Sequence, residues 1–479
     1  MDLGLASRPV KTTLSDVTIS AGDKIVARLE GPLVPDRWTD LRLPKSAFAL
    51  GPLQVSYSGE GGLVVADPCY VRPRSSSPKS AGRPNIIFVV LDSLLPSDIG
   101  LLNGKGSGSI TPNIDRYFQS AFKFRQAYSQ ETWTLPALST FLTGTFAIEH
   151  GVFNPYDHHR SLPDRLDTLP ETLRDAGYRT LGVSTQLRFS PATGHHRGFE
   201  RFIIHADHRE SRSVICDALD FVDAHGDEPF FAMLHCFEPH QPFGELNYGG
   251  NLAAAPIRRA SSHAVMHSDL REGSDEWWEE ADDHRAGKVR EMDFNLGLLF
   301  DYLERSGLLE NTAIILTHDH GRTLKFRDIA LTDGSTQAPL LIRKPRETGG
   351  FVDGLVENTV DLFATTLALA DLPNPPESQG RDILAPDFGG HSIIRSERLF
   401  QDTFELSLRT PDWRYNLVAA FDRSCGKADV EQARAETLRA IRPDGGEEAE
   451  NRLADFPEKA EEFRQHVAAH MKQAGAYFR

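Results

Sequence analysis

Side chains that could bind a metal ion follow two apolar runs of this sequence. Asp92 ends the run IIFVVL, and Asp319 and His320 lie in THDHG directly after AIIL. A carboxylate together with an imidazole suits zinc or manganese better than calcium, which prefers oxygen ligands alone. Each cluster also has a purely structural interpretation, because Asp often ends a strand as a turn or cap residue.

A hydroxyl that could act as a nucleophile lies at the start of a predicted helix. Residues 133–144 have helically spaced apolar side chains and end in Gly144, and Thr134 is near the expected N-cap. Thr134 would then either cap the helix or carry out chemistry. A helix N-terminus stabilises an anion, so a metal-bound hydroxyl there could ionise and attack phosphorus.

Two histidines follow the apolar run PFFAML in the segment HCFEPHQPF. His240 lies between two prolines that stiffen the loop, and it could donate a proton to a leaving oxygen or bind a substrate anion. His235 falls inside the predicted strand and is interpreted as structural. The sequence therefore predicts one functional histidine in this segment.

The elements that must position these residues alternate between strands and helices. Buried strands are expected at residues 85–91, 178–184, 229–236, 312–317 and 338–342. Amphipathic stretches at 283–306 and 360–372 predict helices between or after them. Such alternation is typical of an α/β fold, with a mostly parallel sheet and helices on both faces, in which ligands bind beyond the carboxyl ends of the strands.

The composition of the chain changes at both ends. Residues 1–75 alternate short β-rich pieces with Gly and Pro turns and predict a small β-rich unit. A Ser- and Pro-rich linker is expected at 76–84, followed by a catalytic α/β domain at 85–391. Residues 392–479 combine β-like pieces with a charged helix at 457–473, which predicts a small α+β subdomain.

The overall composition excludes several classes of protein. The 479 residues are 40% hydrophobic and 25% charged, so the chain can bury a large core. A formal net charge of -16 argues against a general nucleic-acid binder, which needs clustered cations. The four cysteines form no C-x-x-C pair, and no run of apolar residues is long enough to span a bilayer. We expect a cytoplasmic protein with no membrane span.

Taken in order, the segments resemble the sulfatase branch of the alkaline-phosphatase superfamily from about Arg83 onward. RPNIIFVVLDS resembles the opening strand, WTLPALSTFLTGTFAIEHGV the nucleophile region and CFEPHQPF the loop of the substrate histidine. REMDFNLGLLFDYLERSGLLENTAIILTHDHG is similar to the long helix and second metal strand of that family. The resemblance implies that Asp92, Asp319 and His320 hold a divalent cation with Thr134, which supplies the nucleophilic oxygen.

The chain departs from true sulfatases at three positions. Sulfatases oxidise a Cys or Ser in C/S-x-P-x-R to formylglycine, whereas this chain has Thr134 and, in place of the Arg, Leu138. Threonine cannot yield the aldehyde. Ser93 stands where many sulfatases have a second acid. The remaining set is similar to the single-metal site of phosphoethanolamine and glycerol-phosphate transferases, whose nucleophile is a threonine.

A substrate-binding lysine is expected after THDHG by the same resemblance. Arg322, Lys325 and Arg327 are candidates in a loop shorter than the family's, and Lys325 ranks first. The predicted cofactor is one divalent metal ion, zinc or manganese, with calcium or magnesium as alternatives.

The predicted function is that of a metal-dependent phosphoester hydrolase, acting on mono- or diesters, or of a phosphotransferase with a Thr nucleophile and a small-molecule ester as substrate. Two alternatives remain open. One is a sulfuric ester hydrolase that works without formylglycine, and the other is a non-catalytic binding protein with the sulfatase fold.

Overall fold

The fold is taken from a computed structural model of the chain. It describes fifteen stretches, which are residues 2–7, 15–32, 39–42, 52–59, 63–69, 82–104, 109–153, 161–186, 189–205, 210–240, 275–321, 331–400, 402–422, 427–442 and 445–474. Residues 76–81 of the predicted linker at 76–84 lie outside them, and the domain boundaries stay a prediction.

The largest sheet has nine strands and contains every strand predicted for the central region. Its order is β10-β9-β11-β7-β12-β13-β8-β14, with β15 paired to β8. The bounds are β7 (Asn85–Leu91), β8 (Phe122–Tyr128), β9 (Arg179–Ser184), β10 (Arg201–Ile204), β11 (Phe230–Cys236), β12 (Thr312–Thr317), β13 (Gln337–Arg343), β14 (Phe351–Val352) and β15 (Val356–Glu357).

The prediction of a mostly parallel sheet is confirmed, with one exception. The strand β13 runs antiparallel to both of its neighbours, β12 and β8, while the other neighbouring strands pair in parallel. Four strands, β8, β10 and the two-residue strands β14 and β15, have no counterpart in the sequence-based prediction. β8 alternates apolar residues with charged or polar ones, and β10 has four residues, so neither forms a continuous apolar run.

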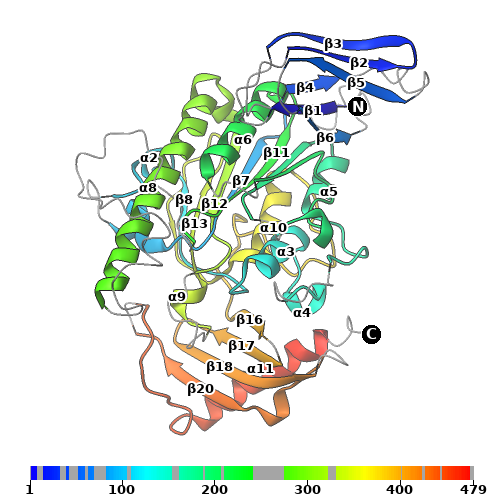
Figure 1. The fold of residues 1–479 in the computed structure, drawn as a ribbon. Helices are drawn as coiled ribbons and strands as arrows, with labels where there is room; N and C mark the ends of the chain where they lie inside the picture. The colour runs from blue at the N-terminus through cyan, green and yellow to red at the C-terminus, as the bar shows by residue number, and fades with distance from the viewer. Residues whose placement is uncertain are drawn as a thin grey trace.

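Helices cover both faces of this sheet, as predicted (Figure 1). The helices α2 (Pro112–Tyr117), α6 (Ser211–His225) and α8 (Asp275–Arg305) lie on one side, and α3 (Thr134–Thr143), α5 (Leu169–Asp175) and α10 (Asn358–Leu369) on the other. Side chains alternate along each strand, so odd positions of β7 pack with α8 and even positions pack with α3. Short helical turns η2 (Pro96–Asp98), α1 (Gly100–Asn103), α4 (Ala147–His150), η4 (Pro191–Thr193), η6 (Leu308–Asn311) and α9 (Asp333–Thr336) connect the larger elements.

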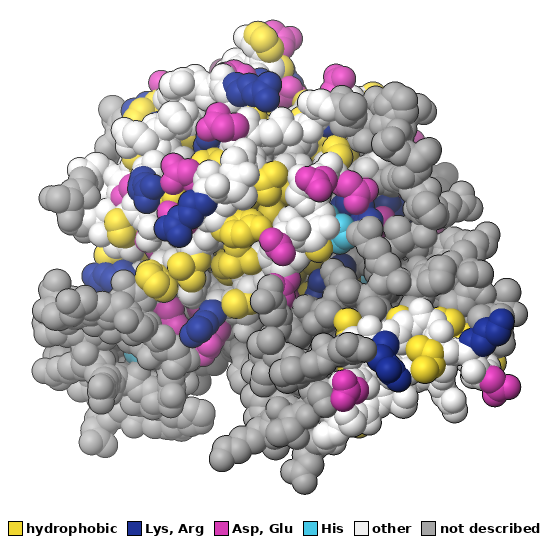
Figure 2. Space-filling model, turned by 90° about the horizontal axis from the view of Figure 1, so that it is seen from above, with side chains coloured by type: hydrophobic (Ala, Val, Ile, Leu, Met, Phe, Trp, Pro, Cys, Tyr) yellow, Lys and Arg dark blue, Asp and Glu magenta, His cyan; other side chains and the backbone are white. Residues whose placement is uncertain are grey.

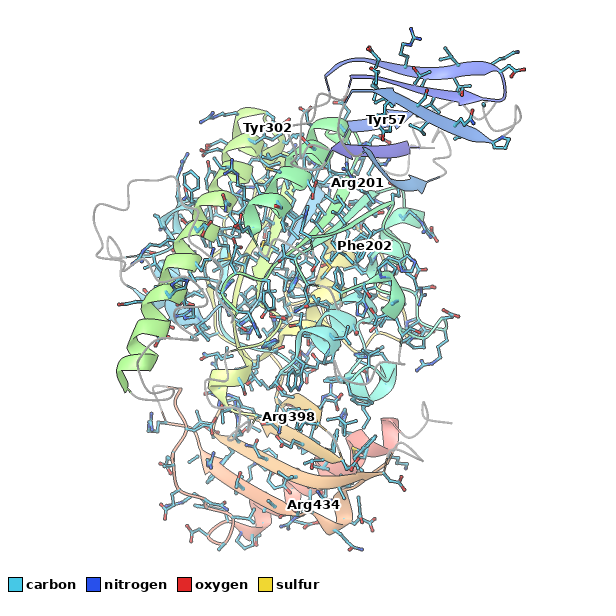
Figure 3. All side chains as sticks on the ribbon, in the orientation of Figure 1. Tyr57, Arg201, Phe202, Tyr302, Arg398 and Arg434 are labelled. Carbon is cyan, nitrogen blue, oxygen red and sulfur yellow. The ribbon has the colours of Figure 1, made fainter. Side chains whose placement is uncertain are left out.

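Two smaller β-rich parts flank the large sheet (Figure 1). The N-terminal part has two three-stranded sheets, β4-β1-β6 and β3-β2-β5. Their bounds are β1 (Asp2–Ser7), β2 (Ser15–Ala21), β3 (Lys24–Pro32), β4 (Thr39–Arg42), β5 (Leu53–Ser58) and β6 (Leu63–Cys69). Tyr57 lies in β5 of this part, and Arg201 and Phe202 lie in β10 of the large sheet (Figure 3).

The C-terminal part is an antiparallel sheet covered by one helix, as predicted. Its elements are β16 (Ile394–Phe400), β17 (Thr403–Arg409), β18 (Trp413–Asp422), β19 (Lys427–Asp429), η7 (Val430–Gln432), β20 (Ala435–Ala440) and α11 (Pro457–Ala474). The helix packs on the sheet through Phe463, whose ring stacks on Tyr415 at 5.4 Å. Arg398 lies in β16, and Arg434 directly precedes β20 (Figure 3).

Hydrogen bonds connect the C-terminal sheet to the carboxyl edge of the large sheet. Ser396 of β16 donates to the carbonyl oxygen of Ser129 at 2.6 Å, and the Ser129 hydroxyl donates to the carbonyl oxygen of Asp319. Two buried arginines, Arg409 and Arg414, form ion pairs with Asp333 in α9. The C-terminal sheet therefore supports the described residues on both sides of 322–330, the segment that follows the predicted metal ligands.

The described surface carries charges of both signs. On the face seen in Figure 2, Lys and Arg side chains are intermixed with Asp and Glu. No helix within the described ranges has the length and apolarity needed to cross a membrane.

Glu131 connects the two helices that lie behind the predicted nucleophile. Its carboxylate accepts hydrogen bonds from Thr140 of α3 at 2.6 Å and from Thr359 of α10 at 3.1 Å. Burial is the largest effect on this group and raises its pKa to about 8 from the ordinary 4.5, and the carboxylates of Glu397 and Glu357 act in the same direction. The folded state therefore favours the protonated carboxyl.

Replacing Glu131 should change how stability depends on pH. Because the folded pKa is raised, Glu131 stabilises the fold fully below about pH 4.5 and loses that contribution as the pH rises through about 8. We expect Glu131→Gln to lose less free energy of unfolding between these pH values than the wild type does, by up to a few kcal/mol, since one pKa unit is about 1.4 kcal/mol. Urea denaturation at each pH measures this.

The matched control is Glu431→Gln, which changes an exposed carboxylate in η7. This variant should follow the wild-type curve. If Glu131→Gln follows it too, Glu131 is not the buried titrating group described above.

Candidate active site

Three strands that lie side by side in the large sheet end at the same edge. β7 pairs in parallel with both β11 and β12, and the backbone N–H of Asp92 donates to the carbonyl oxygen of Cys236 at 2.9 Å. Asp92 and Asp319 follow the ends of β7 and β12, and both are completely buried. The two carboxylates therefore lie at one edge of the sheet, as predicted.

The helix α3 brings Thr134 to the same point. The Thr134 hydroxyl donates to Asp92 Oδ2 at 3.2 Å and lies 3.3 Å from His320 Nε2. Thr134 is the first residue of the helix, while Trp133 is the N-cap, and no side chain caps this helix end. The capping interpretation of Thr134 is therefore wrong, because its hydroxyl faces the carboxylate and the imidazole rather than the backbone of α3.

Ser93 supports the two carboxylates instead of adding a third. Its hydroxyl donates to Asp92 Oδ1 at 2.9 Å, and its backbone N–H donates to Asp319 Oδ1 at 3.4 Å. Ser93 has a φ of 60°, which a residue with a side chain rarely adopts and which aims both donors at the site. Asp319 Oδ1 also accepts from the backbone N–H of His320 at 2.9 Å. Asp319 Oδ2 has no hydrogen-bond partner among the described residues.

The imidazole of His320 is oriented by the backbone. Its Nδ1 donates to the carbonyl oxygen of Gly321 at 2.8 Å, so Nε2 faces the site, 3.5 Å from Asp319 Oδ2 and 3.7 Å from Asp92 Oδ1. Burial lowers the pKa of His320, but Asp319 and Asp92 outweigh it and raise that pKa above the usual value. Burial likewise acts to raise the pKa of Asp92, while His240, His320 and His235 bring it below its usual value.

His240 lies just beyond the end of β11, as predicted. It is half-buried, its ring stacks on Phe237 at 4.5 Å, and its centroid is 6.1 Å from that of His320. One atom each from Asp92, His240 and His320 lie within 4.8 Å of one another. His240 is thus close enough to the nucleophile region to contact a substrate bound there.

His235 is the site residue that the sequence-based interpretation missed. Its Nε2 is 3.8 Å from Asp92 Oδ2 and 4.0 Å from Asp319 Oδ2, and Asp92, His235 and Asp319 form a second group of neighbouring ligand atoms. Burial is the largest effect on the pKa of His235 and brings it below the usual value, although Asp319 and Asp92 act in the opposite direction. The alternation of side chains along β11 was the signal for this position, because it places His235 on the same face as Phe231 and Met233. That face packs on α3.

Four further residues come from the comparison with the sulfatase motif and its substrate-binding lysine. Lys325, Arg322 and Arg327 lie outside the described residues, so the substrate-binding lysine stays a prediction. Leu138, which replaces the arginine of the sulfatase motif, is fully buried in the apolar core between α3 and the sheet. Position 138 therefore offers no charge to a substrate anion.

The residues at this edge fit a divalent cation. They offer carboxylate oxygens, a hydroxyl and imidazole nitrogens within a few ångströms of one another, and one carboxylate oxygen has no hydrogen-bond partner in the described part of the chain. Neither buried carboxylate forms an ion pair with Lys or Arg among the described residues, so their negative charge remains available to a metal ion.

Comparison with known proteins shows the family of this chain. A family model described as Sulfatase matches residues 84–372. An uncharacterized sulfatase of Escherichia coli is 24% identical over 368 residues, which cover 63% of this chain and 71% of that protein. The N-acetylgalactosamine-6-sulfatase of Canis lupus familiaris is also 24% identical, over 65% of this chain and 67% of its own length.

Solved structures share the fold at low sequence identity. A putative sulfatase from Bacteroides thetaiotaomicron has a TM-score of 0.65 and 17% identity over 82% of this chain and 93% of its own. A phosphonate monoester hydrolase from Silicibacter pomeroyi has a TM-score of 0.61 and 18% identity over 82% of this chain and 96% of its own. Since the family model spans more than half of the 479 residues, the chain belongs to the sulfatase family of hydrolases.

Proposed function

We propose that this chain is a metal-dependent phosphoester hydrolase or phosphotransferase with Thr134 as its nucleophile. The observation that supports this most directly is the position of the Thr134 hydroxyl, 3.2 Å from Asp92 Oδ2 and 3.3 Å from His320 Nε2. A hydroxyl between a carboxylate and an imidazole can lose its proton and attack an ester. Since threonine cannot form the aldehyde of formylglycine, the hydroxyl oxygen itself would be the attacking atom.

One divalent cation, zinc or manganese, would be held by Asp92, Thr134, Asp319 and His320. When bound, such an ion lowers the pKa of a coordinated hydroxyl and offsets the negative charge of the phosphoryl oxygens. Carboxylate and imidazole donors together favour these two metals over calcium and magnesium.

The chain's own groups account for the proton transfers of the first step. Asp92 Oδ2 accepts the Thr134 proton as the oxygen attacks phosphorus in line with the leaving alcohol. His240 donates a proton to the leaving oxygen as its bond to phosphorus breaks. The products of this step are the free alcohol and a phosphorylated Thr134.

The second step uses the same groups in reverse. Water or an acceptor alcohol gives its proton to His240 and attacks the phosphorus of the phosphorylated threonine. The bond to Thr134 breaks, and the threonine oxygen regains its proton from Asp92. Hydrolysis and transfer differ only in which nucleophile enters at this point, so the proposal includes both.

Sulfate ester hydrolysis is the second candidate, and the curated relatives favour it. Several are named as sulfatases, among them the human N-sulphoglucosamine sulphohydrolase, which is 25% identical over 65% of this chain. The chemistry of Thr134 weighs against it, because a sulfated threonine lacks the aldehyde hydrate through which formylglycine enzymes eject sulfate. A non-catalytic binding protein is the third alternative and would turn over neither class of ester.

Replacing Thr134 should separate these functions. We expect wild-type protein to hydrolyse aryl phosphate or bis-aryl phosphate faster than aryl sulfate, and Thr134→Ala to lose at least about 10³-fold in kcat because the attacking oxygen is gone. Thr134→Ser keeps the oxygen and should retain measurable turnover. Mass spectrometry of acid-quenched reactions should show one phosphoryl group on the peptide containing residue 134.

The opposite pattern would reject the nucleophile. Unchanged turnover in Thr134→Ala, with no adduct in the wild type, would show that another group attacks. Faster cleavage of aryl sulfate, with a sulfated peptide, would favour the second candidate instead.

Metal binding gives an independent test of the same site. We expect elemental analysis to find about one divalent ion per chain and Asp319→Asn to bind it at least tenfold more weakly, because removing ligand charge weakens a metal site. Added zinc at roughly 100 times its Kd should stabilise the metal-free wild type by about 2.7 kcal/mol in thermal unfolding. Asp353→Asn is the matched control, since this carboxylate is 71% exposed and pairs with Arg125. Equal metal content in wild type and Asp319→Asn would argue against this site.

A further inference from the structure

The proposed mechanism makes no use of His235, although its side chain lies within the site. The residue is 0% exposed, and its Nε2 has no hydrogen-bond partner among the described residues. Buried polar atoms in folded proteins nearly always have a partner, because leaving one unpaired costs free energy. An unpaired nitrogen that faces two carboxylates therefore points to a cation as its missing partner.

The distances around His235 Nε2 suit a cation shared with Asp92 and Asp319. Two atoms that are each bonded to one ion at about 2.0 to 2.1 Å can be at most about 4.2 Å apart. His235 Nε2 meets this limit against Asp92 Oδ2 at 3.8 Å and against Asp319 Oδ2 at 4.0 Å. Thr134 Oγ1 and Asp92 Oδ2 are 3.2 Å apart, and His320 Nε2 is 3.5 Å from Asp319 Oδ2, so these pairs meet it as well.

The other ring nitrogen of His235 is held by Ser184 at the end of β9. His235 Nδ1 is 3.0 Å from Ser184 Oγ, which also accepts a hydrogen bond from the backbone N–H of Gln186 at 2.9 Å. We assign the proton to Nδ1, as a donor to Ser184, which leaves the Nε2 lone pair directed at the carboxylates. His320 has the same arrangement, with Nδ1 bound to a carbonyl oxygen and Nε2 directed at the site.

We propose that His235 Nε2 is a further metal ligand of this site and that Ser184 orients it. The inference rests on the proposed metal-dependent function and extends its ligand set to two imidazoles, two carboxylates and the Thr134 hydroxyl. Two nitrogen donors make the site discriminate against calcium and magnesium, which prefer oxygen ligands, and in favour of zinc and cobalt. The metal preference of the chain thus depends on a residue of β11 as well as on the THDHG segment.

The experiment compares metal affinity in full-length wild type and His235→Gln. Zinc and calcium affinities are measured by competition with a chromophoric chelator after metal removal. We expect the zinc Kd to rise at least about 100-fold in His235→Gln, while calcium binding changes by less than about threefold. The visible spectrum of the cobalt-loaded protein should shift, since it reports the donors on the ion. His225→Gln, a buried histidine of α6 on the opposite face of the sheet, should keep the wild-type affinity and spectrum.

A second variant keeps the test decisive if His235→Gln does not fold. Ser184→Ala keeps His235 but removes its orienting partner, together with the acceptor for the Gln186 N–H. We expect it to weaken zinc binding about tenfold and to change the cobalt spectrum slightly. Wild-type zinc affinity and an unchanged cobalt spectrum in every folded variant would overturn the role of His235 and leave the proposed function standing. A wild type that binds no ion would overturn both.

Discussion

The site depends on two carboxylates that share one buried point at the edge of the sheet. Asp92 and Asp319 are both inaccessible to solvent, and two negative charges at such a position are strongly unfavourable unless something offsets them. In the described residues the chain places His235, His240 and His320 around them instead of Lys or Arg. A fixed lysine or arginine would neutralise the carboxylates permanently. An imidazole can release its proton and offer a lone pair, so the same residues that tolerate the charge can serve a metal ion.

The position of the nucleophile depends on buried packing of α3 rather than on a cap. No side chain caps the helix, but every residue from Leu135 to Thr143 is buried. Glu131 joins α3 to α10, and the carbonyl oxygen of Gly144 accepts from the backbone N–H of Gln379 at 2.8 Å. The C-terminal half of the helix is therefore fixed by contacts with other elements. The Thr134 hydroxyl is free of any role in the helix and can face the carboxylates.

The sequence predicted the elements with strong local signals and missed those with weak ones. Continuous apolar runs identified β7, β11 and β12, and their shared edge brought Asp92, Asp319 and His320 together. The reversed direction of β13 could not be read from its apolar run, because a buried strand has the same composition in either direction. His235 was interpreted as structural because the alternation along β11 shows which residues share its face but not what that face meets. That depends on which helix covers each face, which is a tertiary property.

The C-terminal sheet contributes to this site without supplying a reactive group. Ser396 binds the backbone of Ser129, whose hydroxyl in turn binds the carbonyl oxygen of Asp319, so β16 helps to fix the height of the second carboxylate above the sheet. Arg409 and Arg414 fix Asp333, and the N–H of Gly321 donates to the carbonyl oxygen of Ser335 in the same turn. A carboxylate displaced by an ångström would no longer share an ion with the residues of β7 and α3, because metal bonds near 2 Å allow little variation. The geometry of the site is therefore a property of both sheets, although all its predicted ligands come from the larger one and from α3.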